Sequence, residues 1–154
     1  MNEIAARPID TVEELIAFVD LRGVHTYEVS GKRAEPAVEG DDVAVQEPMA
    51  IEIREQHDEG RIVGRFRATM TASGCDLVAD VGAEYAFSEP LSLSRPAIEG
   101  FLEKVAVMAA WPFIRETIAT TAARLQIPVP LLGLLKQGDF HVNPAGIDLN
   151  DTTA

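Results

Sequence analysis

Apolar and polar residues alternate through the middle of the chain, and this pattern predicts a β-sheet. The alternation covers residues 24–30, 49–56, 61–71 and 76–87. Each stretch has one apolar and one polar side, which is typical of antiparallel strands with one face on a core and the other in water. No helical stretch lies between these strands to force parallel pairing. We therefore expect a four-stranded antiparallel β-meander.

The period of the apolar residues changes after Pro90, from two to between three and four. Ser94 suits a helix N-cap, and Pro96 suits the first helical turn. The residues that follow predict one apolar helical face before Trp111 and a second one after Pro112. Because proline has no N–H and clashes with the preceding turn, we expect one helix to stop and another to begin at Trp111-Pro112. Two C-terminal helices would then pack against the sheet.

A further short helix is predicted near the N-terminus. Thr11 and Glu14 have the spacing of a capping box, and the apolar residues after them form one helical stripe over residues 11–22. The predicted fold class is therefore α+β, with a single domain over residues 1–142. Residues 143–154 are expected to form a flexible tail because of their proline, glycine and Asp, Asn and Thr content.

Charge and composition narrow the classes of partner. The chain has 25 acidic against 13 basic residues, a formal net charge of −12 at pH 7, which disfavours nucleic-acid binding. An acidic surface is often only solubilising, but it can also attract basic or unfolded polypeptides. The single cysteine, Cys75, cannot form an internal disulfide, and no apolar run reaches the ~18 residues of a membrane span. Residues 1–4 lack the pattern of a signal peptide, so we expect a cytoplasmic protein.

The sequence offers no evident catalytic or metal centre. Its three histidines are scattered, without the spacing to a second histidine or cysteine that metal sites use. No nucleophile elbow, P-loop or dinucleotide-binding motif occurs. Asp76, Asp80 and Glu84 share one face of the last predicted strand, where we expect them to be exposed rather than in the pocket that acid–base catalysis requires. We expect no enzyme activity, no cofactor and no metal.

Apolar residues near the C-terminus are the remaining candidates for function. Two leucine pairs flank Gly133 without helical or strand register. They either tuck over the core as an extended segment or form the wall of a groove for extended apolar peptide. Nearby methionine and aromatic side chains would suit such a groove. The candidate client-binding residues are Met108, Trp111, Phe113, Leu131, Leu132, Leu134 and Leu135.

Several stretches together resemble the SecB family of bacterial chaperones, which hold unfolded precursors for export. Residues 111–118, Trp-Pro-Phe-Ile-Arg-Glu-Thr-Ile, are similar to that family's aromatic-Pro-aromatic-x-Arg-Glu-x-Ile segment. Residues 67–73 and 77–81 resemble its central hairpin, and residues 24–30 its first strand. The resemblance implies a four-stranded antiparallel sheet backed by helices, assembly as a dimer or a dimer of dimers, and binding of unfolded protein in apolar grooves without ATP.

The resemblance also implies roles for two sets of residues. Those expected to help subunits associate are Leu77, Ala79 and Ala83. Those expected to form an acidic face that docks the SecA motor are Glu28, Val78 and Asp80.

Three differences from the family pattern bear on the partner. Lys32 occupies what resembles a further acidic position, the C-terminal helix is missing, and a helix over residues 11–22 is added. These differences resemble the SecB-like chaperones of toxin–antitoxin modules. The leading hypothesis is an ATP-independent holdase for unfolded or precursor proteins. The alternatives are a dedicated chaperone of an antitoxin and a non-enzymatic oligomeric scaffold that binds a small ligand.

Overall fold

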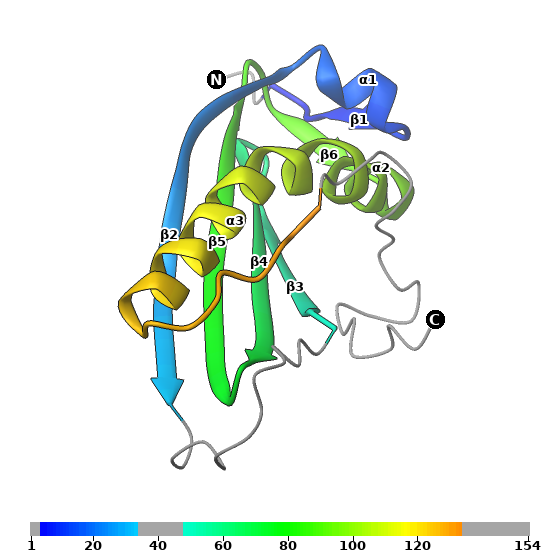
Figure 1. Ribbon diagram of the computed structural model, residues 1–154. Helices are drawn as coiled ribbons and strands as arrows, with labels where there is room; N and C mark the ends of the chain where they lie inside the picture. The colour runs from blue at the N-terminus through cyan, green and yellow to red at the C-terminus, as the bar shows by residue number, and fades with distance from the viewer. Residues whose placement is uncertain (1–3, 34–47, 134–154) are drawn as a thin grey trace.

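A computed structural model describes residues 4–33 and 48–133 and confirms the α+β fold class. The main sheet contains four strands, all pairing antiparallel: β2 (Val19–Arg33), β3 (Ala50–His57), β4 (Arg61–Ala72) and β5 (Cys75–Phe87). The C-terminal helical region lies across one face of this sheet (Figure 1). No helix in the described part of the chain is long and apolar enough to cross a membrane.

The order of the strands is β2-β5-β4-β3, so the meander comprises β3, β4 and β5. Tight turns join these three strands. The Asp58 carboxylate accepts from the backbone N–H of Gly60 at 2.7 Å, and Ser73 and Gly74 adopt positive φ angles of 49° and 74°. No tight turn joins β2 to β3, since β2 ends at Arg33 and β3 begins at Ala50. Strand β2 is therefore free to pair with β5, at the edge of the meander opposite β3.

The N-terminal helix begins as predicted but is much shorter. The Thr11 hydroxyl accepts from the Glu14 backbone N–H at 3.2 Å, and α1 (Val12–Ile16) follows. The predicted extension of this helix over residues 17–22 is wrong, because the chain enters β2 at Val19 and pairs with β5 from that residue onward. Pairing of β2 with β5 therefore overrides the local helical pattern of residues 17–22.

A second, two-stranded sheet was not predicted. It pairs β1 (Arg7–Ile9) in parallel with β6 (Leu91–Leu93). Both strands have three residues, too few for an alternating pattern to be visible in the sequence. The domain boundary at residue 142 and the tail over residues 143–154 lie outside the described residues.

The helical region runs without a break at Trp111-Pro112, so the predicted junction there is wrong. Ser94 caps α2 (Arg95–Phe101), a π-helical segment η1 (Leu102–Ala106) follows, and α3 (Val107–Arg124) contains Pro112 in its interior. Pro112 is exposed, so its ring points away from the packed side of the helix. Burial of the opposite side of α3 against the sheet outweighs the one hydrogen bond that the proline removes.

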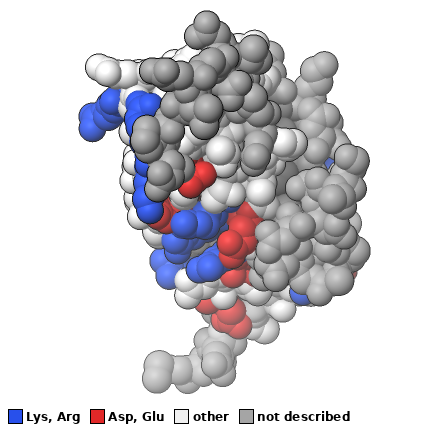
Figure 2. All heavy atoms as spheres, turned by 60° about the horizontal axis from the view of Figure 1, so that its bottom comes forward, with Lys and Arg blue, Asp and Glu red and all other residues white. Residues whose placement is uncertain are grey.

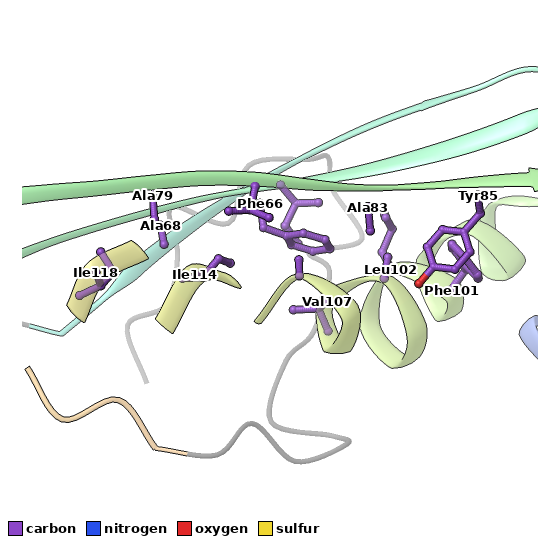
Figure 3. Packing of buried hydrophobic residues seen from close by; sticks show 14 of the residues in the cluster. Phe66, Ala68, Ala79, Ala83, Tyr85, Phe101, Leu102, Val107, Ile114 and Ile118 are labelled. Carbon is purple, nitrogen blue, oxygen red and sulfur yellow. The ribbon is translucent and has the colours of Figure 1, made fainter. Parts of the chain in front are cut away.

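One hydrophobic core fills the space between the helices and the sheet (Figure 3). Phe66 and Ala68 of β4 and Ala79 of β5 face the helices, and Ile114 and Ile118 of α3 face the sheet. The helical region also approaches the sheet closely at Gly64 of β4, where an added Cβ would lie 2.8 Å from Cδ2 of Leu102. Among residues 4–33 and 48–133, no helix lies on the opposite face of the sheet (Figure 1), and we call it the open face.

Candidate functional site

The predicted client-binding residues of α3 lie on opposite sides of the helix. Trp111 and Phe113 are two residues apart, which corresponds to about 200° around an α-helix. Ile114, between them on the wheel, is fully buried against the sheet. The two aromatic side chains therefore belong to two different surfaces, one on each flank of α3.

On the first flank, Trp111 anchors the chain segment that follows α3. This segment turns back along the helix (Figure 1, orange). The indole Nε1–H donates to the Gly133 carbonyl at 3.1 Å, and Leu132 packs partly against the core. Met108, one turn before Trp111, is exposed, and Leu131 is 89% exposed. We group Met108, Trp111, Leu131 and Leu132 as the α3–tail surface, because Trp111 holds the segment that carries the two leucines beside α3.

On the second flank, a hollow of about 500 Å³ lies between α3 and β2. Its lining includes Val29 and Gly31 of β2 and Thr117, Thr121 and Leu125 near the end of α3. The close approach at Gly31 is evident because an added Cβ would lie 2.4 Å from Cγ2 of Thr121. The volume is in the range of small-ligand pockets, and binding of a small ligand stays an untested alternative.

Sequence reasoning did not find this hollow. Its lining mixes threonines with isolated apolar residues from two distant parts of the chain, and only the pairing of β2 with β5 brings them together. Phe113, which is 47% exposed, lies on the same flank as Thr117 and Thr120, four and seven residues later. Leu134 and Leu135, the remaining predicted client residues, lie outside the described residues. Client binding by all seven residues stays a prediction.

The residues predicted to help subunits associate are placed in the core. Leu77, Ala79 and Ala83 point from β5 toward the helices and are fully buried within one chain. Their side chains cannot contact a second subunit directly in this arrangement. Any contribution to association would be indirect, through the position of β5 and of the strand β2 that pairs with it.

Asp80, predicted to dock SecA, lies on the open face but is only 1% exposed. Arg65 donates from Nε and Nη2 to Oδ1 and Oδ2 of Asp80, both at 2.8 Å. Arg67 donates to Glu28 and also approaches Oδ2 of Asp80 at 3.3 Å. Val78 is half-buried on the same face. Docking at Glu28, Val78 and Asp80 stays a prediction, but the expectation that Asp80 is exposed is wrong because two guanidinium groups cover it.

The two arginines are held in their charged form. The hydrogen bond to Asp80 raises the pKa of Arg65, and the hydrogen bond to Glu28 raises the pKa of Arg67. The Tyr27 ring lies 4.2 Å from the guanidinium carbon of Arg65, a cation–π contact. Sequence reasoning missed this cluster, although both arginines alternate on the polar side of a predicted strand.

Charges of both signs are intermixed on the surface despite the net charge of −12. Figure 2 shows Lys and Arg side chains gathered directly beside Asp and Glu side chains on one face of the molecule. Within residues 4–33 and 48–133, no group of three or more His, Cys, Asp or Glu residues could hold a metal ion, and Cys75 is buried.

The fold and these surfaces define a class of protein: a four-stranded antiparallel sheet covered on one face by a C-terminal helical region, with exposed apolar surface along the last helix. No family model matches the chain. The chain is 27% identical over 133 residues, 86% of either chain, to the SecB-like chaperone SmegB of Mycolicibacterium smegmatis.

A solved structure has the same fold. It is the SecB-like chaperone Rv1957 of Mycobacterium tuberculosis in complex with a ChAD peptide from the antitoxin HigA1, with a TM-score of 0.68 and 15% identity. The match covers 80% of this chain and 96% of that one. The resemblance to SecB-like chaperones, first evident in residues 111–118, is confirmed by the relative in sequence and by the solved structure in fold.

Proposed function

We propose that the protein is an ATP-independent, non-enzymatic holdase of the cytoplasm that binds unfolded or precursor polypeptides at the α3–tail surface. The observation that supports this most directly is the exposure of Met108 on α3 and of Leu131 in the segment that Trp111 fastens to α3. Burial of apolar client surface gains about 25 cal/mol per Å², so many weak contacts suffice without sequence specificity. The SecB-like relatives in sequence and fold support the same function.

The holdase function predicts that stoichiometric protein suppresses aggregation of a slow-folding client. Leu131→Asp should weaken client binding on the order of tenfold, because one leucine contributes about 1.5–3 kcal/mol when buried. Binding is measured by fluorescence anisotropy of a labelled unfolded client, and aggregation by light scattering.

Ile4→Asp is the matched control for this experiment. Ile4 is 75% exposed and precedes β1, away from α3, so this variant should keep full protection. Equal client aggregation with and without the wild-type protein would refute the holdase function. Equal losses of client protection in Leu131→Asp and Ile4→Asp would show that clients do not bind at the α3–tail surface.

A dedicated antitoxin chaperone is the second candidate. The observation that favours it is the fold shared with a SecB-like chaperone whose solved structure contains an antitoxin peptide. Such a chaperone should bind the apolar tail of one antitoxin far more tightly than generic unfolded protein. Affinity measurements for both ligands distinguish the candidates, and comparable values would exclude the dedicated role.

We place self-association of this holdase at the outer edge of β2. Within the described residues β2 pairs only with β5, so its other edge presents unpaired backbone N–H and C=O groups. Val29 on this strand is 58% exposed and lines the hollow beside α3. Identical edges can pair around a twofold axis, which fits the expected dimer or dimer of dimers.

This assembly predicts that Val29→Glu lowers the molecular mass in solution toward that of one chain. A glutamate there would place a charge in an apolar contact, which is unfavourable unless it finds a partner. Mass is measured by light scattering after size exclusion. Val129→Glu is the control, since Val129 is 53% exposed but belongs to the segment after α3 and not to β2. An unchanged mass for Val29→Glu would place the interface elsewhere.

A further inference from the structure

The open face of the sheet carries charges that are paired across its strands. Strand β4 supplies three arginines to this face. Arg61 and Arg65 contact carboxylates of the adjacent strand β5, and Arg67 reaches across β5 to Glu28 of β2. Arg61 donates to Glu84 of β5 at 2.8 Å, on the same face as the pairs made by Arg65 and Arg67. Within the described residues, the arginines of β4 are therefore paired with carboxylates of β5 and of the more distant strand β2.

Asp80 is the most enclosed member of this set. Both of its carboxylate oxygens are occupied by the Arg65 guanidinium, and Arg67 lies beside one of them. In the sheet register, Arg67 is opposite Asp80, whereas Arg65 is opposite Gly82. Because Gly82 has no side chain, Arg65 can reach diagonally to Asp80. The Tyr27 ring lies over Gly82, where an added Cβ would be 2.6 Å from Cε2 of Tyr27.

We propose that Arg65 and Arg67 determine which partners the open face accepts, by pairing with the carboxylates of Asp80 and Glu28. A free carboxylate pair on a strongly acidic protein would attract lysine- and arginine-rich segments. Here the same carboxylates are neutralised within the chain, so a basic partner would have to displace two arginines that already satisfy them. The open face thus fits a partner of mixed charge and rejects a polycationic one, which is specificity by exclusion.

The first test uses the wild-type protein. Carbodiimide coupling of an amine to carboxyl groups, mapped by mass spectrometry, should leave Asp80 unlabelled under conditions that label Asp58 and Glu13. The side chains of these two residues are 66% and 73% exposed. Labelling of Asp80 at the same rate as Asp58 would overturn the proposal, and this measurement does not depend on the folding of a variant.

The second test measures binding of a fluorescent oligolysine peptide to Arg65→Gln/Arg67→Gln at low salt. Two exposed carboxylates should tighten binding by roughly tenfold relative to a matched control, and added salt should reduce the gain. The control is Arg7→Gln/Arg95→Gln, which makes the same charge change and frees Glu89 and Glu99 outside this face. Equal tightening in both double variants would overturn the proposal.

Arg67→Gln alone keeps the bidentate Arg65–Asp80 pair and serves if the double variant does not fold. It should still bind oligolysine more tightly than Arg95→Gln, because Glu28 is freed, and absence of that gain would overturn the proposal. Client protection at the α3–tail surface is measured in parallel. It should be unchanged, so failure of this proposal and failure of the holdase function are distinguishable.

Discussion

Phe101→Ala is expected to lower the free energy of unfolding by about 3–5 kcal/mol, the range for loss of a fully buried aromatic ring. Phe101 has 0% exposure at the end of α2, where the chain passes into η1. Its ring meets the Tyr85 ring edge-on, with centroids 4.8 Å apart and an interplanar angle of 85°. The substitution removes this contact and leaves a cavity between the helices and β5. Urea denaturation followed by circular dichroism measures the loss.

Phe113→Ala is the matched control because it makes the same chemical change in α3 at a ring that is 47% exposed. It should cost about 1 kcal/mol or less, as most surface substitutions do. Similar losses of unfolding free energy in the two variants would contradict the burial of Phe101 in the core. Burial also raises the pKa of Tyr85, which agrees with a desolvated position for this aromatic pair.

The elements that could be predicted from the sequence are those whose signals are local. Period-two alternation located β3, β4 and β5, and the hydroxyls of Thr11 and Ser94 cap helices as expected. The order of the strands was not predictable, because pairing of β2 with β5 depends on contacts between residues far apart in sequence. The same reason explains the missed pairing of β1 with β6.

Pro112 shows why a strong local signal can mislead. A proline predicts a helix end when only the backbone hydrogen bond is considered. In α3 the proline occupies the exposed side, while Ile114 and Ile118 on the other side are buried against the sheet. The irregular segment is η1 instead, where the helix approaches Gly64 of β4. Tertiary packing, which the pattern of one segment cannot reveal, decided where the helix departs from regularity.

The candidate surfaces were predictable only in part, for a related reason. Alternation placed Asp80 on the polar face of its strand, and that placement is confirmed. Its burial was not foreseen, because the positions of Arg65 and Tyr27 over Asp80 and Gly82 follow from the register of three strands. Trp111 and Phe113 are both predicted to bind client, but the 100° step of the helix separates them onto two flanks.

Arg65→Ala is expected to destabilise the protein more than the double variant Arg65→Ala/Asp80→Ala. Removing the arginine alone leaves the carboxylate of Asp80, which is 1% exposed, with only Arg67 at 3.3 Å. Breaking a buried pair costs about 3–5 kcal/mol, and we expect about 3 kcal/mol here because the Arg65 side chain is itself 32% exposed. Removing both partners leaves no uncompensated charge, so the double variant should recover about 1 kcal/mol or more.

The four proteins of this double-mutant cycle are compared by urea denaturation at one pH and ionic strength. A coupling term of about 1 kcal/mol or more is expected, because Arg65 and Asp80 share two hydrogen bonds and not only a charge attraction. Arg61 and Glu84 on the same face form the matched exposed pair, whose side chains are 47% and 26% exposed, and their cycle should give a smaller coupling. If the losses at Arg65 and Asp80 simply add, the carboxylate is accessible to water in solution. Arg65 would then not cover Asp80 on the open face, and the selectivity of that face would require another cause.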